Sequence, residues 1–207
     1  MAEVFLASRN AKKLAEMQRI LSQWLPDVVV LGLDDVAAYD EPVEDQPTFE
    51  GNALVKARAG VKASGRPTIA DDSGLCVDAL NGMPGVLSAR WSGTRGDRAE
   101  VDARNNALLL DQIADVPDER RGAHFACAVA LCLPGGEEHV LHGRMDGRII
   151  REVRGAGGFG YDVLFVADEH AADGRTSAEL DPAEKDEISH RGRALRALAP
   201  VVAQVLG

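Results

Sequence analysis

Two adjacent acids, Asp71 and Asp72, are the residues of this chain best suited to chemistry. They follow a β-like run over residues 67–70 and precede Ser73 and Gly74. A strand that ends there would place both carboxylates at the rim of a sheet, where paired oxygen ligands suit a hard cation such as Mg²⁺. A carboxylate-held Mg²⁺ indicates a phosphate ester or anhydride substrate. The alternative is a polar turn in which the acids cap backbone amides, and this motif alone does not decide between them.

A second candidate segment, residues 8–13, lies at the turn from an expected first strand into an expected first helix. The free amides and positive dipole end of a helix N-terminus suit phosphate, and a hydroxyl, an amide and ammonium groups add to this. The glycine-rich spacing of a Walker loop is absent. The alternative is a capped surface helix with solvated lysines.

A third segment, residues 48–57, predicts a helix that presents Asn52 and Lys56 on one face, with Phe49 beside a pocket. Glu44 belongs to the acidic, proline-containing loop that precedes it. The alternative is an ordinary amphipathic helix with an exposed Lys56.

Two further segments indicate recognition of a flat ring. Residues 158–162 place Phe159 and Tyr161 among glycines and end in Asp162, a pattern that could stack a base and contact a ribose. Residues 185–191 bring a Lys, a His and an Arg to another helix start, and an Arg fork can read carbonyl acceptors on a base edge. The alternatives are a glycine-rich turn and surface charge. The charges at Arg98 and at residues 102–104 are interpreted as solvated.

The elements that must position these residues alternate between strand and helix patterns. This alternation, with one antiparallel hairpin, predicts a mixed α/β fold in one domain over residues 1–207. Strands are expected over 3–7, 27–33, 67–70, 123–133, 137–146 and 163–166, and helices over 10–24, 48–64, 97–113 and from 190 onward, capped by Ser189.

Composition narrows the class of protein. Hydrophobic residues make up 45% of the chain, enough for a core, and the formal net charge of -10 argues against binding to DNA or to an anionic membrane. The three cysteines form no Cys-x-x-Cys pair, which predicts buried, reduced thiols in a cytoplasmic protein. The longest apolar run, residues 125–133, is too short to span a bilayer, and charges near the N-terminus leave no signal-peptide core.

Four motifs in this order resemble the family of noncanonical purine nucleoside triphosphate pyrophosphatases, the inosine/xanthosine triphosphatase type. The motifs are Thr48-Phe-Glu-Gly-Asn-Ala-x-x-Lys-Ala, Ala70-Asp-Asp-Ser-Gly-Leu, Gly158-Phe-Gly-Tyr-Asp and Ser189-His-Arg-Gly-Arg-Ala. The resemblance implies an elongated mixed sheet with flanking helices, two lobes and a central cleft. It also implies a homodimer, a Mg²⁺ requirement and cleavage of inosine, deoxyinosine or xanthosine triphosphate to the monophosphate and pyrophosphate, which cleanses the nucleotide pool.

The resemblance also implies a role for individual residues. The triphosphate would be held by Ser8, Arg9, Asn10, Ala11, Lys12, Lys13 and Lys56. Mg²⁺ would be held by Glu44 and Asp72, and Asp72 would accept the proton of the attacking water. Ser73 would touch the substrate, and the base and sugar would be bound by Phe159, Gly160, Tyr161, Asp162, Lys185, His190 and Arg191.

The chain departs from the family pattern in three places. Arg9 stands where a small residue is common, Val163 follows the Tyr-Asp pair in place of a common proline, and the loop over residues 168–176 is slightly long. The acidic loop aligns loosely, so that Glu44 is preferred to Glu41 as the second metal ligand without excluding Glu41.

Two rival functions stay open. A related pyrophosphatase that prefers modified pyrimidines would share the same motifs, and a substrate panel separates the two. A nucleotide-binding sensor without catalysis would bind inosine triphosphate and release no product, although such a sensor need not keep Asp72 and Lys56. A nucleic-acid-binding module is disfavoured by the net charge.

Overall fold

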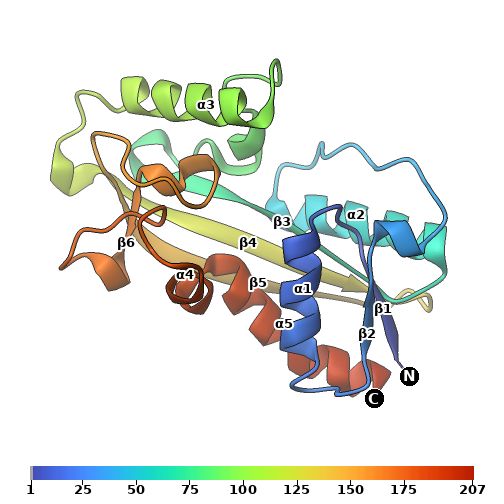
Figure 1. Ribbon diagram of the computed structural model, residues 1–207. Coiled ribbons are helices and arrows are strands. Elements are labelled where there is room, and N and C mark those ends of the chain that lie inside the picture. Colours follow the sequence, from blue (N-terminus) through green and yellow to red (C-terminus); the bar gives the residue numbers. More distant parts are fainter. Residues whose placement is uncertain (1) are drawn as a thin grey trace. The chain divides into compact units, whose positions relative to one another are not determined.

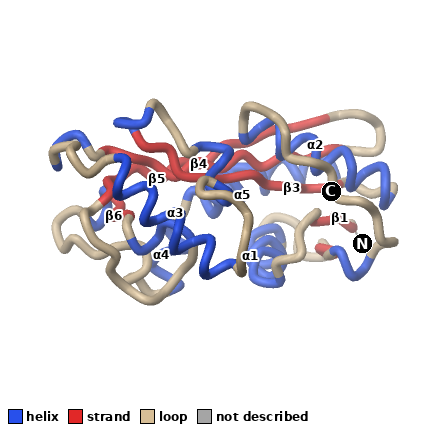
Figure 2. Tube along the Cα trace, turned by 90° about the horizontal axis from the view of Figure 1, so that it is seen from above, coloured by secondary structure: helices blue, strands red, loops and turns tan. Residues whose placement is uncertain are grey.

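The protein is an α/β structure built on a mixed sheet (Figures 1 and 2). A computed structural model describes residues 2–207, apart from the side chain of Lys12. Within this part of the chain six strands occur in the order β2-β1-β3-β4-β5-β6. The strands are β1 (Glu3–Leu6), β2 (Val29–Leu31), β3 (Thr68–Val77), β4 (Gly122–Cys132), β5 (Glu138–Ile149) and β6 (Phe165–Ala167). The helices are α1 (Ala11–Leu21), α2 (Phe49–Ser64), α3 (Arg98–Gln112), α4 (Pro182–Ile188) and α5 (His190–Leu206).

The sheet combines both strand directions, which confirms the expected mixed α/β class. β1 pairs in parallel with β2 and with β3, whereas β5 and β6 are antiparallel. Parallel neighbours need a crossover connection, and α1 and α2 supply it here. No helix in residues 2–207 is both long and apolar enough to cross a membrane.

The chain divides into two compact units. Unit 1 comprises Met1–Asp72, Cys127–Gly143 and Arg193–Gly207, and unit 2 comprises Ser73–Ala126 and Arg144–Gly192. Strands β3, β4 and β5 each contribute residues to both units. The expectation of one domain over the whole chain stays a prediction, as do the elongated shape and the cleft.

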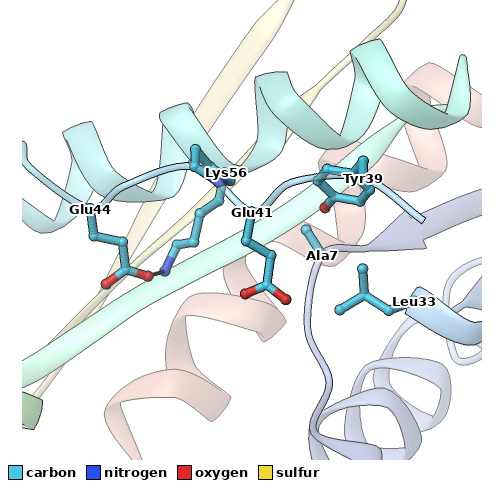
Figure 3. A pocket seen from close by; sticks show the side chains of 7 residues that line it. Ala7, Leu33, Tyr39, Glu41, Glu44 and Lys56 are labelled. Carbon is cyan, nitrogen blue, oxygen red and sulfur yellow. Dashed lines mark hydrogen bonds and ion pairs between the residues drawn. The ribbon is translucent and has the colours of Figure 1, made fainter. Parts of the chain in front are cut away.

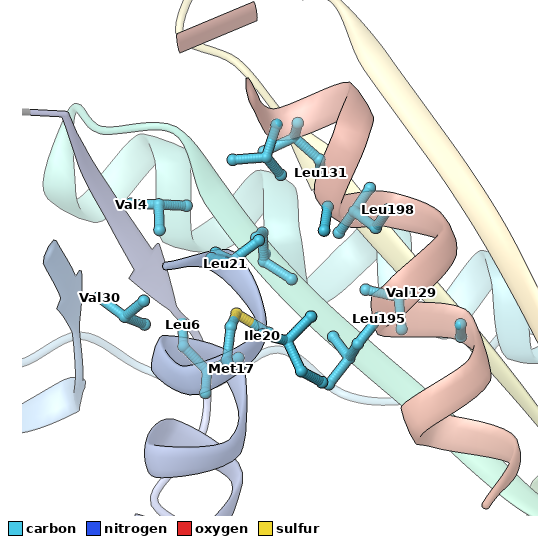
Figure 4. Close-up of a cluster of buried hydrophobic side chains, with 14 of the residues drawn as sticks. Val4, Leu6, Met17, Ile20, Leu21, Val30, Val129, Leu131, Leu195 and Leu198 are labelled. Atoms are coloured by element: carbon cyan, nitrogen blue, oxygen red, sulfur yellow. The ribbon is translucent and has the colours of Figure 1, made fainter. Parts of the chain in front are cut away.

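Unit 1 has a core on each face of its strands. On one face α1 and α5 pack against the strands, with Met17, Leu21 and Leu198 among the buried side chains (Figure 4). On the other face α2 contributes small residues, Ala53 and Ala57, which meet alanines and Cys132 of the sheet. Small side chains allow the backbone of α2 to approach the sheet closely.

Unit 2 has one main hydrophobic core. Leu109 of α3 and Ile113, which follows the helix, pack there with Leu75 of β3, Met145 of β5 and Phe165 of β6. The rings of Phe125 and Phe165 lie edge to face with centroids 4.8 Å apart, a favourable arrangement for aromatic pairs.

Local helix signals are confirmed. Thr48 caps α2 by accepting a hydrogen bond from the amide of Gly51, and Gly65 ends this helix in the left-handed conformation, with φ 65°. Asp97 opens α3 with a capping box, and the Ser189 hydroxyl accepts from the Gly192 amide in the first turn of α5.

Two expectations about the elements are wrong. β3 does not end at the acids but continues to Val77, because Leu75 and Val77 are buried in the unit-2 core and extend the pairing. The segment before the last helix forms a helix of its own, α4, which the sequence signals with an Asp181 cap, Pro182 at the first position and Glu184 closing a capping box.

Candidate functional site

Asp71 and Asp72 lie in the middle of β3, and their side chains serve opposite faces of the sheet. Successive residues of a strand point to opposite sides. Asp71 therefore shares the side of Ile69 and reaches α1, whereas Asp72 shares the side of Ala70 and reaches α2. The expected rim position is wrong, and the pair is two single acids with different partners.

On the α1 side, Asp71 forms a close ion pair. Its Oδ2 atom lies 2.6 Å from Nζ of Lys13, and the Asp71 side chain is only 4% exposed. Cys127 lies near the pair, where burial first and the charge of Asp71 second raise the pKa of the thiol well above its usual value. The thiol therefore stays protonated. Cys127 and Cys132 are buried as expected, whereas Cys76 is half-buried.

On the α2 side, Asp72 is held by two groups from one helix face. Nδ2 of Asn52 donates to Oδ2 of Asp72 at 2.9 Å, and Nζ of Lys56 lies 3.6 Å from Oδ1. Asn52 is fully buried and its own Oδ1 accepts the amide of Gln46. The four-residue spacing places Asn52 and Lys56 on one helix face as expected, although the family resemblance gives Asn52 no role.

Lys56 joins Asp72 to Glu44. Its Nζ donates to Oε1 of Glu44 at 2.7 Å. Burial alone would lower the pKa of Lys56, but the neighbouring carboxylates of Asp72 and Glu44 raise it above its usual value. Lys56 therefore carries its charge at neutral pH, and both acids converge on one cation.

A small pocket lies beside this ion pair. It is lined by Ala7, Leu33, Tyr39, Glu41, Pro42, Glu44 and Lys56. Figure 3 shows the contact between Glu44 and Lys56, and Glu41 lies nearby. Its volume of ≈ 40 Å³ has room for an ion or a few waters but not for a nucleotide. Glu41 pairs with the exposed Arg9 at 2.6 Å, so that the two acids of this loop have different cations.

Residues 8–13 form a capped helix start, in which Lys13 is paired with Asp71 and not solvated as the alternative interpretation has it. The Ser8 hydroxyl accepts from the amide of Asn10 at 3.2 Å, and Oδ1 of Asn10 accepts from the amide of Lys13 at 3.3 Å. Ala11 is the first residue of α1. The side chain of Lys12 lies outside the described part of the structure.

In unit 2, Phe159 presents an exposed ring flanked by cations. Phe159 is 63% exposed, which is unusual for a large hydrophobic residue. Nζ of Lys185 lies 5.2 Å from the ring centroid and Cζ of Arg98 lies 5.9 Å from it, both within cation–π range.

The two residues that follow in this motif, Tyr161 and Asp162, differ in what they contact. Oδ2 of Asp162 accepts the amide of Phe159 at 2.8 Å and Nζ of Lys185 at 2.5 Å. Tyr161 is only 4% exposed, packs in the unit-2 core and donates its hydroxyl to the Ser88 carbonyl at 3.0 Å. The expectation that both aromatics offer a stacking face is therefore wrong for Tyr161, because its ring fills the core.

The remaining predicted residues of unit 2 are partly buried. The ring of His190 stacks on Phe125 with centroids 5.0 Å apart and an interplanar angle of 11°. Burial lowers the pKa of Arg191 to about 10, so its guanidinium stays charged at neutral pH. Ser73 lies half-buried on β3, next to Asp72 in sequence.

Three residues of α3 contact the segment around Phe159. The sequence interpretation treats Arg98 and Asp102 as solvated charges and leaves Asn106 out. Asp102 accepts the amide of Gly160 at 2.9 Å, and Asn106 donates to the Gly160 carbonyl at 2.9 Å. Arg98 joins them through its contact with the Phe159 ring. No local signal could reveal them, because their partners are more than fifty residues away in sequence.

Within the described residues, no three His, Cys, Asp or Glu side chains gather closely enough to hold a metal ion by themselves. Mg²⁺ commonly uses one or two carboxylates and completes its shell with water and substrate phosphates. The convergence of Glu44 and Asp72 on Lys56 matches that smaller requirement.

Comparison with known proteins gives a consistent result. The sequence pattern of the Ham1 family matches residues 4–201. A dITP/XTP pyrophosphatase of Nocardia farcinica is 61% identical over 98% of this chain and 96% of its own length. A solved dITP/XTP pyrophosphatase of Mycobacterium abscessus is 56% identical, with a TM-score of 0.78 over 96% of this chain and 99% of that one. A HAM1 protein of Coxiella burnetii is 40% identical, with a TM-score of 0.84 over 99% of this chain and 100% of that one.

Proposed function

Because the chain belongs to the Ham1 family, we propose that it hydrolyses noncanonical purine nucleoside triphosphates, among them inosine, deoxyinosine and xanthosine triphosphates. The near full-length similarity to proteins named dITP/XTP pyrophosphatase supports this substrate class. The observation that carries the proposal is the group around Asp72, in which an acid, an amide and a charged lysine converge. The biological role is removal of deaminated purines from the nucleotide pool.

The triphosphate is bound by the unit-1 residues. Lys13 and Lys56 are cations that already face carboxylates, and the capped start of α1 offers amides to phosphate oxygens. Glu44 and Asp72 would hold Mg²⁺, since both contact one ammonium and could share one cation. When bound, Mg²⁺ would neutralise charge on the phosphates.

Asp72 is the proton acceptor for the attacking water. Asn52 and Lys56 fix the orientation of its carboxylate, which a general base requires. Water adds to the α-phosphorus, its proton passes to Asp72, and the bond to the β-phosphate oxygen breaks to release pyrophosphate. Lys13 and Lys56 stabilise the charge that develops on this leaving group.

The base is bound by the unit-2 residues. The exposed ring of Phe159 offers a stacking face, and Lys185 is held beside it by Asp162. The charged Arg191 donates to a 6-keto oxygen and meets an adenine 6-amino group badly, because both groups are donors. A polar mismatch of this kind can discriminate by about 10⁴. Ser73 and His190 complete the contacts that the family resemblance assigns.

We also propose that the protein is a homodimer, as the family resemblance implies. Light scattering coupled to size-exclusion chromatography would give twice the chain mass of 22.0 kDa. A single-chain mass at micromolar concentration would contradict this part of the proposal.

Product analysis tests the reaction. Pure protein is incubated with Mg²⁺ and, in separate samples, with inosine, xanthosine and adenosine triphosphates. We expect inosine or xanthosine monophosphate and pyrophosphate, with adenosine triphosphate spared. A diphosphate and free phosphate would move the attack to the γ-phosphorus and contradict the proposed bond.

Adding modified pyrimidine triphosphates to this assay, together with a binding measurement for inosine triphosphate, separates the rival functions. Turnover confined to modified pyrimidine nucleotides would support the related pyrophosphatase. Saturable binding of inosine triphosphate with no product would support the sensor. Either outcome would overturn the proposal.

A further inference from the structure

We propose that Asp102 and Asn106 of α3 are positioning residues for base recognition, because they hold Gly160 and thereby fix the ring of Phe159. This inference rests on the proposed function, in which Phe159 stacks on the base. We call Asp102, Asn106 and Gly160 the α3 clamp.

In the α3 clamp, both the amide and the carbonyl of Gly160 are hydrogen-bonded to side chains of α3. The amide of Gly160 donates to Oδ2 of Asp102 at 2.9 Å, and its carbonyl accepts from Nδ2 of Asn106 at 2.9 Å. Residues four apart on a helix lie on one face, so α3 presents the acceptor and the donor together. A charged acceptor makes the first of these hydrogen bonds the stronger one.

Gly160 needs such support because its backbone is permissive. Its φ of 61° lies in the left-handed region, and Gly158 on the other side of Phe159 has φ 71°. Glycines adopt many conformations at little energetic difference, so a ring flanked by two of them is poorly fixed by local preferences alone. The clamp removes this freedom on one side, and the bond from the Phe159 amide to Asp162 removes it on the other.

Asp102 also orders a cation at the ring. Nε of Arg98 donates to its Oδ1 atom at 3.1 Å, while Oδ2 holds Gly160. The same guanidinium lies 5.9 Å from the centroid of Phe159. The Asp102 carboxylate therefore holds both the backbone of Gly160 and the Arg98 guanidinium that lies near the Phe159 ring.

The platform that carries the clamp is itself fixed. Arg121 is 2% exposed, and its guanidinium donates to the Ile113 carbonyl at the end of α3 at 2.6 Å and to the Ile149 carbonyl of β5 at 3.0 Å. Arg121 thus fixes α3 to the sheet of unit 2. Asp102 and Asn106 on this helix can therefore hold the loop around Gly160 in one place.

Core packing alone does not explain Asn106. The residue is 6% exposed, yet its Oδ1 atom has no hydrogen-bond partner among the described residues. Burying an unsatisfied acceptor destabilises a fold. The Nδ2 contact with Gly160 is the compensating interaction that the structure offers.

The experiment compares D102A and N106A with D111A, which removes the same charge from an exposed position on the same helix. D102N serves as the conservative variant, since its amide oxygen can still accept from Gly160. Steady-state kinetics with inosine triphosphate and Mg²⁺ give KM and kcat, and inhibition by pyrophosphate probes the unit-1 residues separately. Hydrogen exchange at residues 159–161 reports on the Gly160 amide without any need for turnover.

We expect D102A and N106A to raise KM about 10-fold, as for loss of a hydrogen bond to a charged or buried group, with kcat changed far less. Pyrophosphate inhibition should stay unchanged, exchange at residues 159–161 should become faster in D102A, and D102N should recover most of the loss. D111A should match the wild type.

Two results would overturn the inference. KM values equal to that of D111A would show that the clamp does not serve the base, and a parallel weakening of pyrophosphate inhibition would show a general structural defect. Absence of turnover in the wild-type protein is a different outcome, because it contradicts the proposed function itself and removes the premise of the clamp.

Discussion

The candidate residues of unit 1 meet mainly as ion pairs, whereas those of unit 2 combine ion pairs with a ring and with backbone groups. In unit 1, Lys13 faces Asp71, Lys56 faces Glu44 and Asp72, and Arg9 faces Glu41. In unit 2, the central contacts hold the amide and the carbonyl of Gly160, and a ring stays exposed above them.

This difference fits two kinds of ligand. A triphosphate binds where Lys and Arg side chains can leave their carboxylate partners and pair with phosphate oxygens. Until then the ion pairs keep these side chains charged and ordered. A flat base offers little charge, so its partner must supply a rigid surface, and rigidity comes from hydrogen bonds to the backbone. The predictions below test whether the two groups of residues are separable in this way.

The largest effect is expected for Asp72→Asn. Loss of the proton acceptor should lower kcat by about 10³-fold, within the range for general bases. The amide keeps a similar shape beside Asn52 and Lys56, so the thermal unfolding midpoint should stay close to that of the wild type. A kcat within a few-fold of the wild-type value would refute the acceptor role of Asp72.

Lys13→Met should reduce stability, in addition to removing a cation that binds the triphosphate. It leaves the carboxylate of Asp71, which is 4% exposed, without its cation, and breaking a buried pair in this way costs about 3 kcal/mol of unfolding free energy. Urea unfolding measures the loss. The double variant K13M/D71N removes both charges and should recover most of the stability. Equal stability of the single and double variants would mean that the pair is not coupled.

Glu44→Gln should weaken the use of Mg²⁺. The concentration of Mg²⁺ for half-maximal activity should rise about 10-fold, and binding of Mn²⁺ followed by its electron paramagnetic resonance should weaken in parallel. Glu41→Gln is the matched control, because Glu41 lines the same pocket but pairs with Arg9. The reverse pattern would assign the metal to Glu41.

Phe159→Ala should weaken base binding and leave the charges of unit 1 untouched. Loss of stacking should raise KM for inosine triphosphate about 10-fold and alter kcat less. Pyrophosphate inhibition should not change. Val153→Ala removes another exposed hydrophobic side chain of unit 2 and should behave as the wild type. An unchanged KM for F159A would argue against stacking on this ring.

The sequence predicts best what is decided locally. Thr48, Gly65 and Asp97 mark helix ends because a cap depends on a few neighbouring backbone groups. The family motifs assign Lys56 and Asp72 to one site, and Nζ of Lys56 lies 3.6 Å from Oδ1 of Asp72.

The sequence predicts poorly what depends on distant partners. The run after Ala70 looks like a turn because Asp, Ser and Gly favour turns, yet the pairing of β3 and the burial of Leu75 override that preference. Asp102 looks solvated because its partner, Gly160, is far along the chain. Tyr161 looks like a ligand contact because its burial is a property of the unit-2 core and not of the motif.

Successive side chains of β3 point to opposite faces of the sheet, so a deletion of an odd number of residues would exchange the faces of its two acids. Removal of one residue before Asp71 would carry the first acid to the α2 side and the second to the α1 side, so Lys13 and Asn52 would each meet the wrong carboxylate. Removal of two residues would restore the sides but shift both acids about 7 Å along the strand. Neither change preserves the contacts, so the two acids fix the length of this strand as well as its sequence.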